Sequence, residues 1–366
     1  MFLCKLFGVY LFLGSWFFAF AQTSSSNVPR QAGFLYASSQ QQGNIPELAI
    51  EPQSGKLKLL SFQGNQGSIW PNIVNTPNGR YLYGGTAPFQ GYVVTRNIGH
   101  LMAIPNMPTV TVDQLAANAT GRYLLVSDTS SNLLSYSIDQ TSGALTLVDT
   151  VANGSAPKAP LITDSTGKFV YVGFANSIAA YALDLSSGKL TAIPGSPFPS
   201  GANSLFAVSR QHLYAMNFDQ TISGFTVDET TGALSAITGS PWSNPNQQGI
   251  AADPVHNLVF TTNTDFFQGD TQNVVTLFAV NSKGSLSLVG SFGQGYIFDP
   301  YAVLADPSGS FLYVSDLSQN SCAFDACVGA VASFQIDVTT HSLNFVGNVC
   351  ASCDPYDNTE GLALGR

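Results

Sequence analysis

The segment LITDSTGKFVYV (residues 161–172), followed by SIAAYALDLSSGKLTAIPGSPF (residues 177–198), decides the fold. It divides into a small apolar run, an aromatic-rich FVYV run, an alternating run and a final LTAI run. Alternation with a period of two, together with β-branched and aromatic residues, predicts strands. Asp, Ser and Gly between the runs supply turn chemistry. The segment therefore predicts an antiparallel sheet of four short strands, which we name A to D in chain order.

The same unit recurs at intervals of roughly 45 to 55 residues, which is typical of propeller blades. Clear copies begin at Leu115 (LAANATGRYLLV) and Val303 (VLADPSGSFLYV), and weaker copies begin near Ile73, Leu205 and Ile250. Each copy carries the same order of strands and turns. The recurrence predicts a β-propeller.

The two ends of the chain complement each other. Residues 34–37 form a strand B with no strand A before it, and residues 361–364 form a strand A with no strand B after it. Joining them completes one blade beside six continuous ones, and this closure removes the exposed edges of an open ring. We therefore expect an all-β, seven-bladed propeller closed by strands from both termini.

The composition limits the partners. The formal net charge is -9, with 13 Lys and Arg against 22 Asp and Glu. Nucleic acids and anionic membrane surfaces are bound by clustered Lys and Arg, so both are disfavoured. We expect a monomer that binds a small sugar, a lactone or a protein partner.

The N-terminus has the features of an export signal. Lys5 precedes an apolar run over residues 6–20, and Ala19-Phe20-Ala21 forms a cleavage site of the A-x-A type. The prediction is a signal peptide over 1–21, a flexible segment over 22–32 and the propeller over 33–366. A membrane anchor is the alternative for the apolar run. After cleavage we expect no membrane span and a secreted or periplasmic location.

Four cysteines remain after the signal peptide. An even number in an exported chain predicts two disulfides, and the spacing also allows a four-thiolate zinc site. All pairings stay open for Cys322, Cys327, Cys350 and Cys353.

The units DPSGSFLYV and YALDLSSGKL resemble the lactonase family of seven-bladed propellers, which includes 6-phosphogluconolactonases and YVTN-repeat proteins. The resemblance spans nearly the whole mature chain and implies lactone hydrolysis. Catalytic family members often carry Pro-His at the entry to strand A. The matching positions here read Pro71-Asn72, Pro157-Lys158 and Pro300-Tyr301.

The connections differ on the two sides of the predicted disc. A–B and C–D turns lie on one side and are short, whereas B–C and D–A connections lie on the other and are long and varied. Long loops on a rigid scaffold carry function, so we call the second side the ligand face. We expect no histidine-based catalysis on this face, because the sequence places all four histidines on the opposite side or the rim: His100, His212, His256 and His341.

The ligand face instead offers oxygen atoms and aromatic rings. Asp316, in a segment similar to the family's NELS stretch, and Glu360 are the candidate catalytic acids. The ends of the B strands supply Asp128, Asn176, Asn217, Asn263 and Asp316, which either bind Ca²⁺ or another divalent metal, bind sugar hydroxyls or cap turns. Phe198 and Trp242 belong to repeated GSP motifs that we expect to pack between blades. The candidate ligand-binding residues are Trp70, Asn72, Lys158, Asn203, Gln248, Asp299 and Tyr301.

Two functions follow from this inventory. The first expectation is a binding or interaction module for a carbohydrate or a cell-surface partner, because the acid and base groups of the ligand face are few. The alternative is a lactonase-like hydrolase that uses carboxylates, with or without a divalent metal to activate water. A phosphosugar substrate is disfavoured, since Lys158 is the one basic residue assigned to this face. Asn118 and Asn153 stand in triplets that match glycosylation acceptors.

Overall fold

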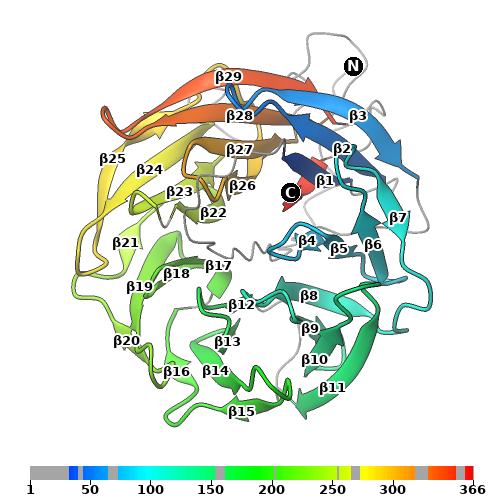
Figure 1. Ribbon diagram of the computed structural model, residues 1–366. Helices are drawn as coiled ribbons and strands as arrows, with labels where there is room; N and C mark the ends of the chain where they lie inside the picture. Colours follow the sequence, from blue (N-terminus) through cyan, green and yellow to red (C-terminus); the bar gives the residue numbers. More distant parts are fainter. Residues whose placement is uncertain are drawn as a thin grey trace, which may run out of the picture.

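The strands of the computed structural model form seven antiparallel sheets around a central axis, as Figure 1 shows. The structure describes residues 33–39, 44–64, 73–152, 161–201, 203–253, 255–264, 273–317, 329–351 and 359–365. The predicted fold class is confirmed. The signal peptide and the segment 22–32 lie outside the described residues and stay predictions.

Every blade places strand A at the centre and strand D at the rim. The A strands are β30 (Thr359–Gly365), β4 (Ile73–Asn75), β8 (Val112–Ala117), β12 (Leu161–Thr163), β17 (Asn203–Ser209), β22 (Gln247–Asp253) and β26 (Pro300–Ala305). The B strands are β1 (Phe34–Ser39), β5 (Tyr81–Gly84), β9 (Tyr123–Asp128), β13 (Phe169–Gly173), β18 (His212–Asn217), β23 (Leu258–Asn263) and β27 (Phe311–Asp316). The C strands are β2 (Ile45–Ile50), β6 (Gln90–Val94), β10 (Asn132–Ile138), β14 (Ser177–Leu183), β19 (Thr221–Val227), β24 (Val274–Val280) and β28 (Ala330–Asp337). The D strands are β3 (Leu57–Gln63), β7 (Leu101–Ala103), β11 (Leu145–Ala152), β15 (Leu190–Ala192), β20 (Leu234–Ala236), β25 (Leu286–Phe292) and β29 (Ser342–Cys350).

The ring closes through the two chain ends, as predicted. In the sheet β3-β2-β1-β30, Leu35 pairs with Leu364 and Ala37 pairs with Leu362, in antiparallel register. Leu35, Ala37 and Leu362 are fully buried. The last strand of the chain therefore becomes the inner strand of the blade that the first strand begins.

The GSP motifs extend the rim of two blades. Phe198 and Trp242 lie in two-residue strands, β16 (Phe198–Pro199) and β21 (Trp242–Ser243), which pair with β14 and β19. Both residues lie between a strand D and the following strand A, and the motif returns to the same sheet before the chain turns inward. The expectation that they pack between blades is confirmed, since both rings contact buried clusters of neighbouring blades.

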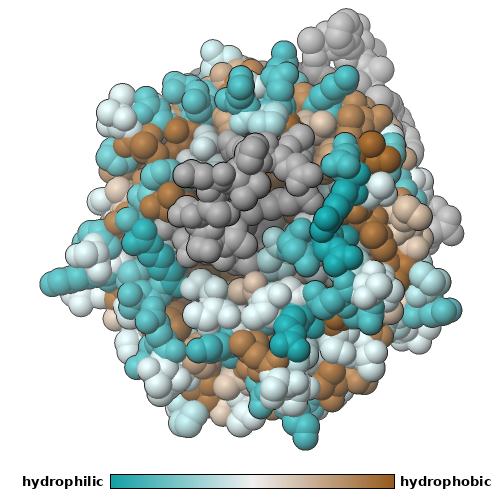
Figure 2. Space-filling model, in the orientation of Figure 1, coloured by the Kyte–Doolittle hydropathy of each residue, from teal (hydrophilic) through white to brown (hydrophobic). Residues whose placement is uncertain are grey.

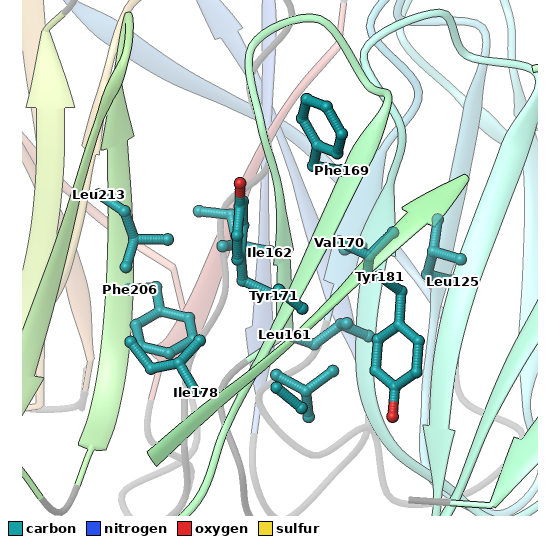
Figure 3. Close-up of a cluster of buried hydrophobic side chains, with 14 of the residues drawn as sticks. Leu125, Leu161, Ile162, Phe169, Val170, Tyr171, Ile178, Tyr181, Phe206 and Leu213 are labelled. Atoms are coloured by element: carbon teal, nitrogen blue, oxygen red, sulfur yellow. The ribbon is translucent and has the colours of Figure 1, made fainter. Parts of the chain in front are cut away.

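The core lies between the blades. One cluster joins Leu125 of β9 to Val170 and Tyr171 of β13 and to Phe206 and Leu213 of the next blade (Figure 3). All five side chains are nearly or completely buried. Side chains alternate between the two faces of each sheet, so each blade contributes to two such interfaces.

Buried tyrosines connect each blade to the next by hydrogen bonds. The Tyr171 hydroxyl donates to the carbonyl of Gly232, 2.9 Å away in the C–D turn of the following blade. Tyr36, Tyr83 and Tyr214 make the same bond to the glycines of their own neighbouring turns. The tyrosine of the FVYV run thus satisfies its polar group inside an apolar interface, as a buried hydroxyl requires.

Aspartates cap the C–D turns. Asp184 accepts hydrogen bonds from the backbone N–H groups of Ser186 and Ser187, and a bond from the Ser186 hydroxyl is the largest cause that lowers its pKa to about 2. The glycine of each turn has a positive φ, for example 73° at Gly232. His341 stands at this position in the last blade, with a φ of 50°.

The rim of the disc carries exposed hydrophobic side chains on its D strands, including Leu60, Met102, Leu147 and Leu288. In the view of Figure 1 hydrophobic residues are interspersed with hydrophilic ones around this rim (Figure 2). The described part of the chain has no helix of the length and apolar character needed to cross a membrane.

Candidate functional site

The strand order fixes which residues share a side of the disc. The ligand face carries the B–C and D–A connections, and the A–B and C–D turns lie opposite. His256 lies between β22 and β23 and His341 between β28 and β29, while His100 precedes β7 and His212 begins β18. All four histidines therefore lie at the A–B or C–D ends of their strands, as predicted.

Strand A carries a bulge at its ligand-face end in five blades. The pairing of strand A with strand B skips one residue there in β8, β17, β22 and β30, and in β26 two residues lie opposite one residue of β27. Bulges re-aim side chains and are frequent beside active sites. Three predicted site residues, Gln248, Tyr301 and Glu360, fall at these irregularities. The positions chosen from the sequence thus coincide with a repeated distortion around the ligand face.

Asp316 occupies the ligand-face end of β27 and is only 1% exposed. Its Oδ2 accepts the N–H of Phe298 at 2.8 Å, and its Oδ1 accepts the N–H of Asp299 at 2.9 Å. A carboxylate that accepts two backbone N–H groups is held in one orientation. Asp316 therefore fixes the chain just before it enters β26.

The carboxyl group of Asp299 combines a buried oxygen atom with a raised pKa. Its Oδ1 is buried and has no hydrogen-bond partner among the described residues. Burial raises the pKa of Asp299 to about 7, and the negative charge of Asp316 adds to this effect, whereas the Thr264 hydroxyl opposes it. Desolvation and a neighbouring like charge both disfavour the charged form of a carboxyl group. The group is therefore poised to exchange a proton near neutral pH.

The neighbouring blade completes the surroundings of Asp299. The Thr264 hydroxyl donates to the carbonyl of Pro300 at 2.9 Å, and the Asn273 amide donates to the carbonyl of Phe298. Both side chains are nearly buried and flank the B–C connection between β23 and β24. The site thus lies at the junction of two blades. Sequence reasoning missed Thr264 and Asn273 as site residues, because they bound a predicted loop without a distinctive motif.

Three other B-strand ends have structural partners. Asp128 accepts N–H bonds from Ser130 and Asn132 and so caps its own turn. Asn217 donates to Thr221 and Ser223. The turn-capping interpretation therefore holds for Asp128.

Asn263 belongs to an amide network between two blades. Its side chain donates to Asn244 Oδ1 at 3.0 Å, and Thr261 donates to Asn263 Oδ1 at 3.0 Å. Asn244 in turn donates to Gln247, whose own amide reaches the carbonyl of Asn217. The network fixes the entry to β22 from the ligand face.

The remaining predicted site residues divide into three groups. Gln248 is half-buried, and Tyr301 is half-buried and packs against the hydrophobic cluster that contains Leu205. Asn203 lies on β17 and Glu360 on β30, and their side chains lie outside the description. Trp70, Asn72 and Lys158 lie outside the described residues altogether. The binding roles of the other six positions and the catalytic role of Glu360 stay predictions.

The structure describes one of the four predicted disulfide cysteines and allows a search for metal ligands among the described residues. Cys350, at the end of β29, is disulfide-bonded. Cys322, Cys327 and Cys353 lie outside the described residues, so the pairing stays a prediction. Within the described ranges no three His, Cys, Asp or Glu side chains gather as a metal site would require.

One glycosylation triplet is explained by the fold. Asn118 is fully buried, and its Oδ1 accepts the N–H of Tyr123 at 3.0 Å. Asn118 caps the A–B turn of its blade, so its amide is not exposed to a modifying enzyme. Asn153 lies outside the described residues.

Three comparisons with known proteins agree on the fold. Residues 96–208 match the family described as "Lactonase, 7-bladed beta-propeller". A protein of Bacteroides fragilis, described as a candidate 6-phosphogluconolactonase, superposes with a TM-score of 0.72 at 15% identity, over 94% of this chain and 100% of that one. The periplasmic gluconolactonase of Pseudomonas aeruginosa superposes with a TM-score of 0.67 at 15% identity, over 92% of this chain and 99% of that one.

No curated protein matches this chain. The identities to the solved structures are low, so these likenesses establish the fold alone. The family match covers the blades around β8 to β17, where the repeat units are clearest. Together these findings confirm the resemblance carried by the repeat units: the chain folds as a seven-bladed β-propeller, and residues 96–208 match the lactonase family.

Proposed function

We propose that this protein hydrolyses a lactone at the Asp299–Asp316 site. The single observation that carries the proposal is the carboxyl group of Asp299, half-buried on the ligand face with one oxygen unpartnered among the described residues, beside the fixed carboxylate of Asp316. The family match supports a lactone as the substrate. The sequence favoured a binding module because it offered few acid or base groups on this face, and the raised pKa of Asp299 supports a role for that residue as a base.

The reaction needs a group that takes and returns one proton. Ionised Asp299 removes a proton from water as the water oxygen forms a bond to the lactone carbonyl carbon. The C–O bond of the ring then breaks, and the protonated Asp299 returns the proton to the leaving oxygen, which becomes a hydroxyl group. General acid–base catalysis is most effective when the pKa of the group lies near the working pH, as the pKa of about 7 does here.

Asp316 acts as a positioning residue in this proposal. Its oxygens accept the N–H groups of Phe298 and Asp299, so it orients the main chain that carries the base. Its negative charge also raises the pKa of Asp299. Thr264 and Asn273 hold the same segment from the adjacent blade.

The proposal is tested with Asp299→Asn. We expect kcat/KM for an uncharged lactone to fall by about 100-fold or more, the range of a lost general base, with the fold unchanged by circular dichroism. Asp219→Asn is the matched control, because Asp219 lies exposed in a B–C turn of the same face and bonds to Thr221. Loss of activity in the control but not in Asp299→Asn would contradict the proposal. If the wild-type chain binds sugars without hydrolysing any lactone, the binding module is the better description.

A further inference from the structure

The positively charged side chains of the described residues all lie at the ends of strands that face away from Asp299. Arg80, Arg122, Lys168 and Arg210 stand in A–B turns, and Lys56, Arg96, Lys189 and Lys283 stand in C–D turns, while Lys58 follows the C–D turn at the start of β3. The histidines follow the same division. A blade strand of five to seven residues separates the two sides by roughly 17–20 Å.

The ligand face carries carboxylates but no Lys or Arg among the described residues. Among the described residues it carries Asp128 at the end of β9, Asp219 after β18, and the pair Asp299 and Asp316. The side of the disc that holds the candidate base is therefore rich in carboxylates.

The immediate surroundings of Asp299 repeat this pattern. The groups that act on its carboxyl are the Asp316 carboxylate and the Thr264 hydroxyl, and neither is a cation. A phosphate group bound here would meet like charge at short range, where the protein lowers the effective dielectric constant below that of water. Carboxylates farther away on the ligand face add a repulsion that salt screens, with a Debye length of about 10 Å at 0.1 M.

Hydroxyl groups interact differently with the same site. A carboxylate is an acceptor, and the hydroxyls of an uncharged sugar lactone can donate to it, whereas an ionised phosphate offers mainly further acceptors. The site is thus complementary to donors without negative charge.

We infer that the substrate of the Asp299 site is an uncharged, hydroxyl-bearing lactone rather than a phosphorylated one. The inference rests on the proposed hydrolase function and adds the class of substrate. An enzyme that acts on a phosphorylated sugar places Arg or Lys donors around the phosphate. The surroundings of Asp299 carry negative charge instead.

The test compares D-glucono-δ-lactone with its 6-phosphate on the purified full chain. Proton release is measured at ionic strengths of about 10 mM and about 200 mM, where the Debye length falls from about 30 Å to below 10 Å. We expect kcat/KM to favour the uncharged lactone by about tenfold or more at low salt. The preference should narrow at high salt, because screening weakens the repulsion of the phosphate.

The outcomes separate the two proposals. Equal or faster hydrolysis of the phosphorylated lactone overturns this inference and leaves the hydrolase function standing. Hydrolysis of neither lactone above its spontaneous rate overturns the hydrolase function for these substrates, and the inference falls with it.

A pair of variants isolates the charge of the ligand face. Asp219 and Glu229 are exposed carboxylates of the same blade, the first in the B–C turn after β18 and the second in the C–D turn after β19. At low salt Asp219→Asn should raise kcat/KM for the phosphorylated lactone by about twofold and leave the uncharged lactone unaffected. Glu229→Gln should change kcat/KM for the phosphorylated lactone by less than twofold and should also leave the uncharged lactone unaffected. Equal effects of the two variants would contradict a role for ligand-face charge.

Discussion

The N–H of Asp299 donates a 2.9 Å hydrogen bond to Oδ1 of Asp316, which joins the end of β27 to the entry of β26. The same bond brings the negative charge of one carboxylate close to the other residue. Asp316 therefore has two effects on Asp299, because it holds the main chain and raises the pKa of the side chain. Geometry and proton affinity at this site are coupled.

The pH dependence of hydrolysis should follow Asp299. Its pKa is raised to about 7, and the base is active when ionised. We therefore expect kcat/KM to increase as the pH rises through about 7 and to level off above it, in rates corrected for spontaneous hydrolysis between pH 5 and 9. A profile that is flat across this range would exclude Asp299 as the base.

Asp316→Asn should move this profile to lower pH. Removal of the negative charge takes away one cause of the raised pKa, so Asp299 ionises more readily. The inflection of kcat/KM against pH is the measurement. A residue with a purely structural role would reduce the rate at every pH and leave the inflection in place. Asp128→Asn, at the corresponding strand end of another blade, should not shift it.

The stability of the fold should depend on Asp299 in the same pH range. The folded pKa of about 7 lies above the ordinary value of 3.8. The unfolded chain therefore releases this proton first, and the folded state loses stability as the pH rises from about 4 to about 7. Urea unfolding at pH 5 and pH 8 should show that Asp299→Asn is more stable than the wild type, with a larger gap at pH 8. A gap that does not grow with pH would contradict the raised pKa.

Tyr171→Phe should weaken the contact between two blades. The variant removes the hydroxyl that donates to the Gly232 carbonyl and leaves that acceptor without its partner. A loss of about 1 kcal/mol in the free energy of unfolding is expected. Tyr296→Phe is the control, because Tyr296 is 52% exposed and its ring stacks on Phe345. Equal losses in both variants would show that the inter-blade bond contributes nothing.

Gly232→Ala should be more destabilising than Gly239→Ala. Both glycines have positive φ, so alanine is strained at each. At Gly232 the new Cβ would also overlap the ring of Phe169 and lie 2.5 Å from Cδ1 of Ile193, whereas at Gly239 nothing lies within 4 Å. Thermal unfolding should show an additional cost of about 1–3 kcal/mol at Gly232, typical of overpacking. Similar midpoints would mean that the interface can relax around the methyl group.

Sequence reasoning predicted the fold because the fold depends on local and repeated signals. The turn glycines, the capping aspartates and the tyrosine of the FVYV run occur once per unit, and each has the role that its chemistry suggests. One local feature was not predicted: the short GSP segment at Trp242 forms a two-residue strand that pairs back with β19. Periodicity cannot reveal a two-residue strand.

The candidate site was harder to predict from the sequence than the fold. Asp299 and Asp316 were both candidates from the sequence, but with separate roles in binding and catalysis. The contact between them depends on the register of β26 against β27, which pairs Pro300 with Asp316 and then shifts, and the strand pattern alone does not give that register. Thr264 and Asn273 come from another blade and carry no motif.

The amino-acid sequence by itself determined the seven blades, their closure through both termini and the side on which each connection lies, because strand alternation and turn residues act over short distances. The tertiary structure alone decided which carboxyl group is buried beside another and therefore holds its proton near neutral pH. The two carboxyl groups meet where β26 pairs with β27, and Thr264 and Asn273 of the adjacent blade pack against the same segment, so the burial that shifts a pKa arises only in the folded propeller.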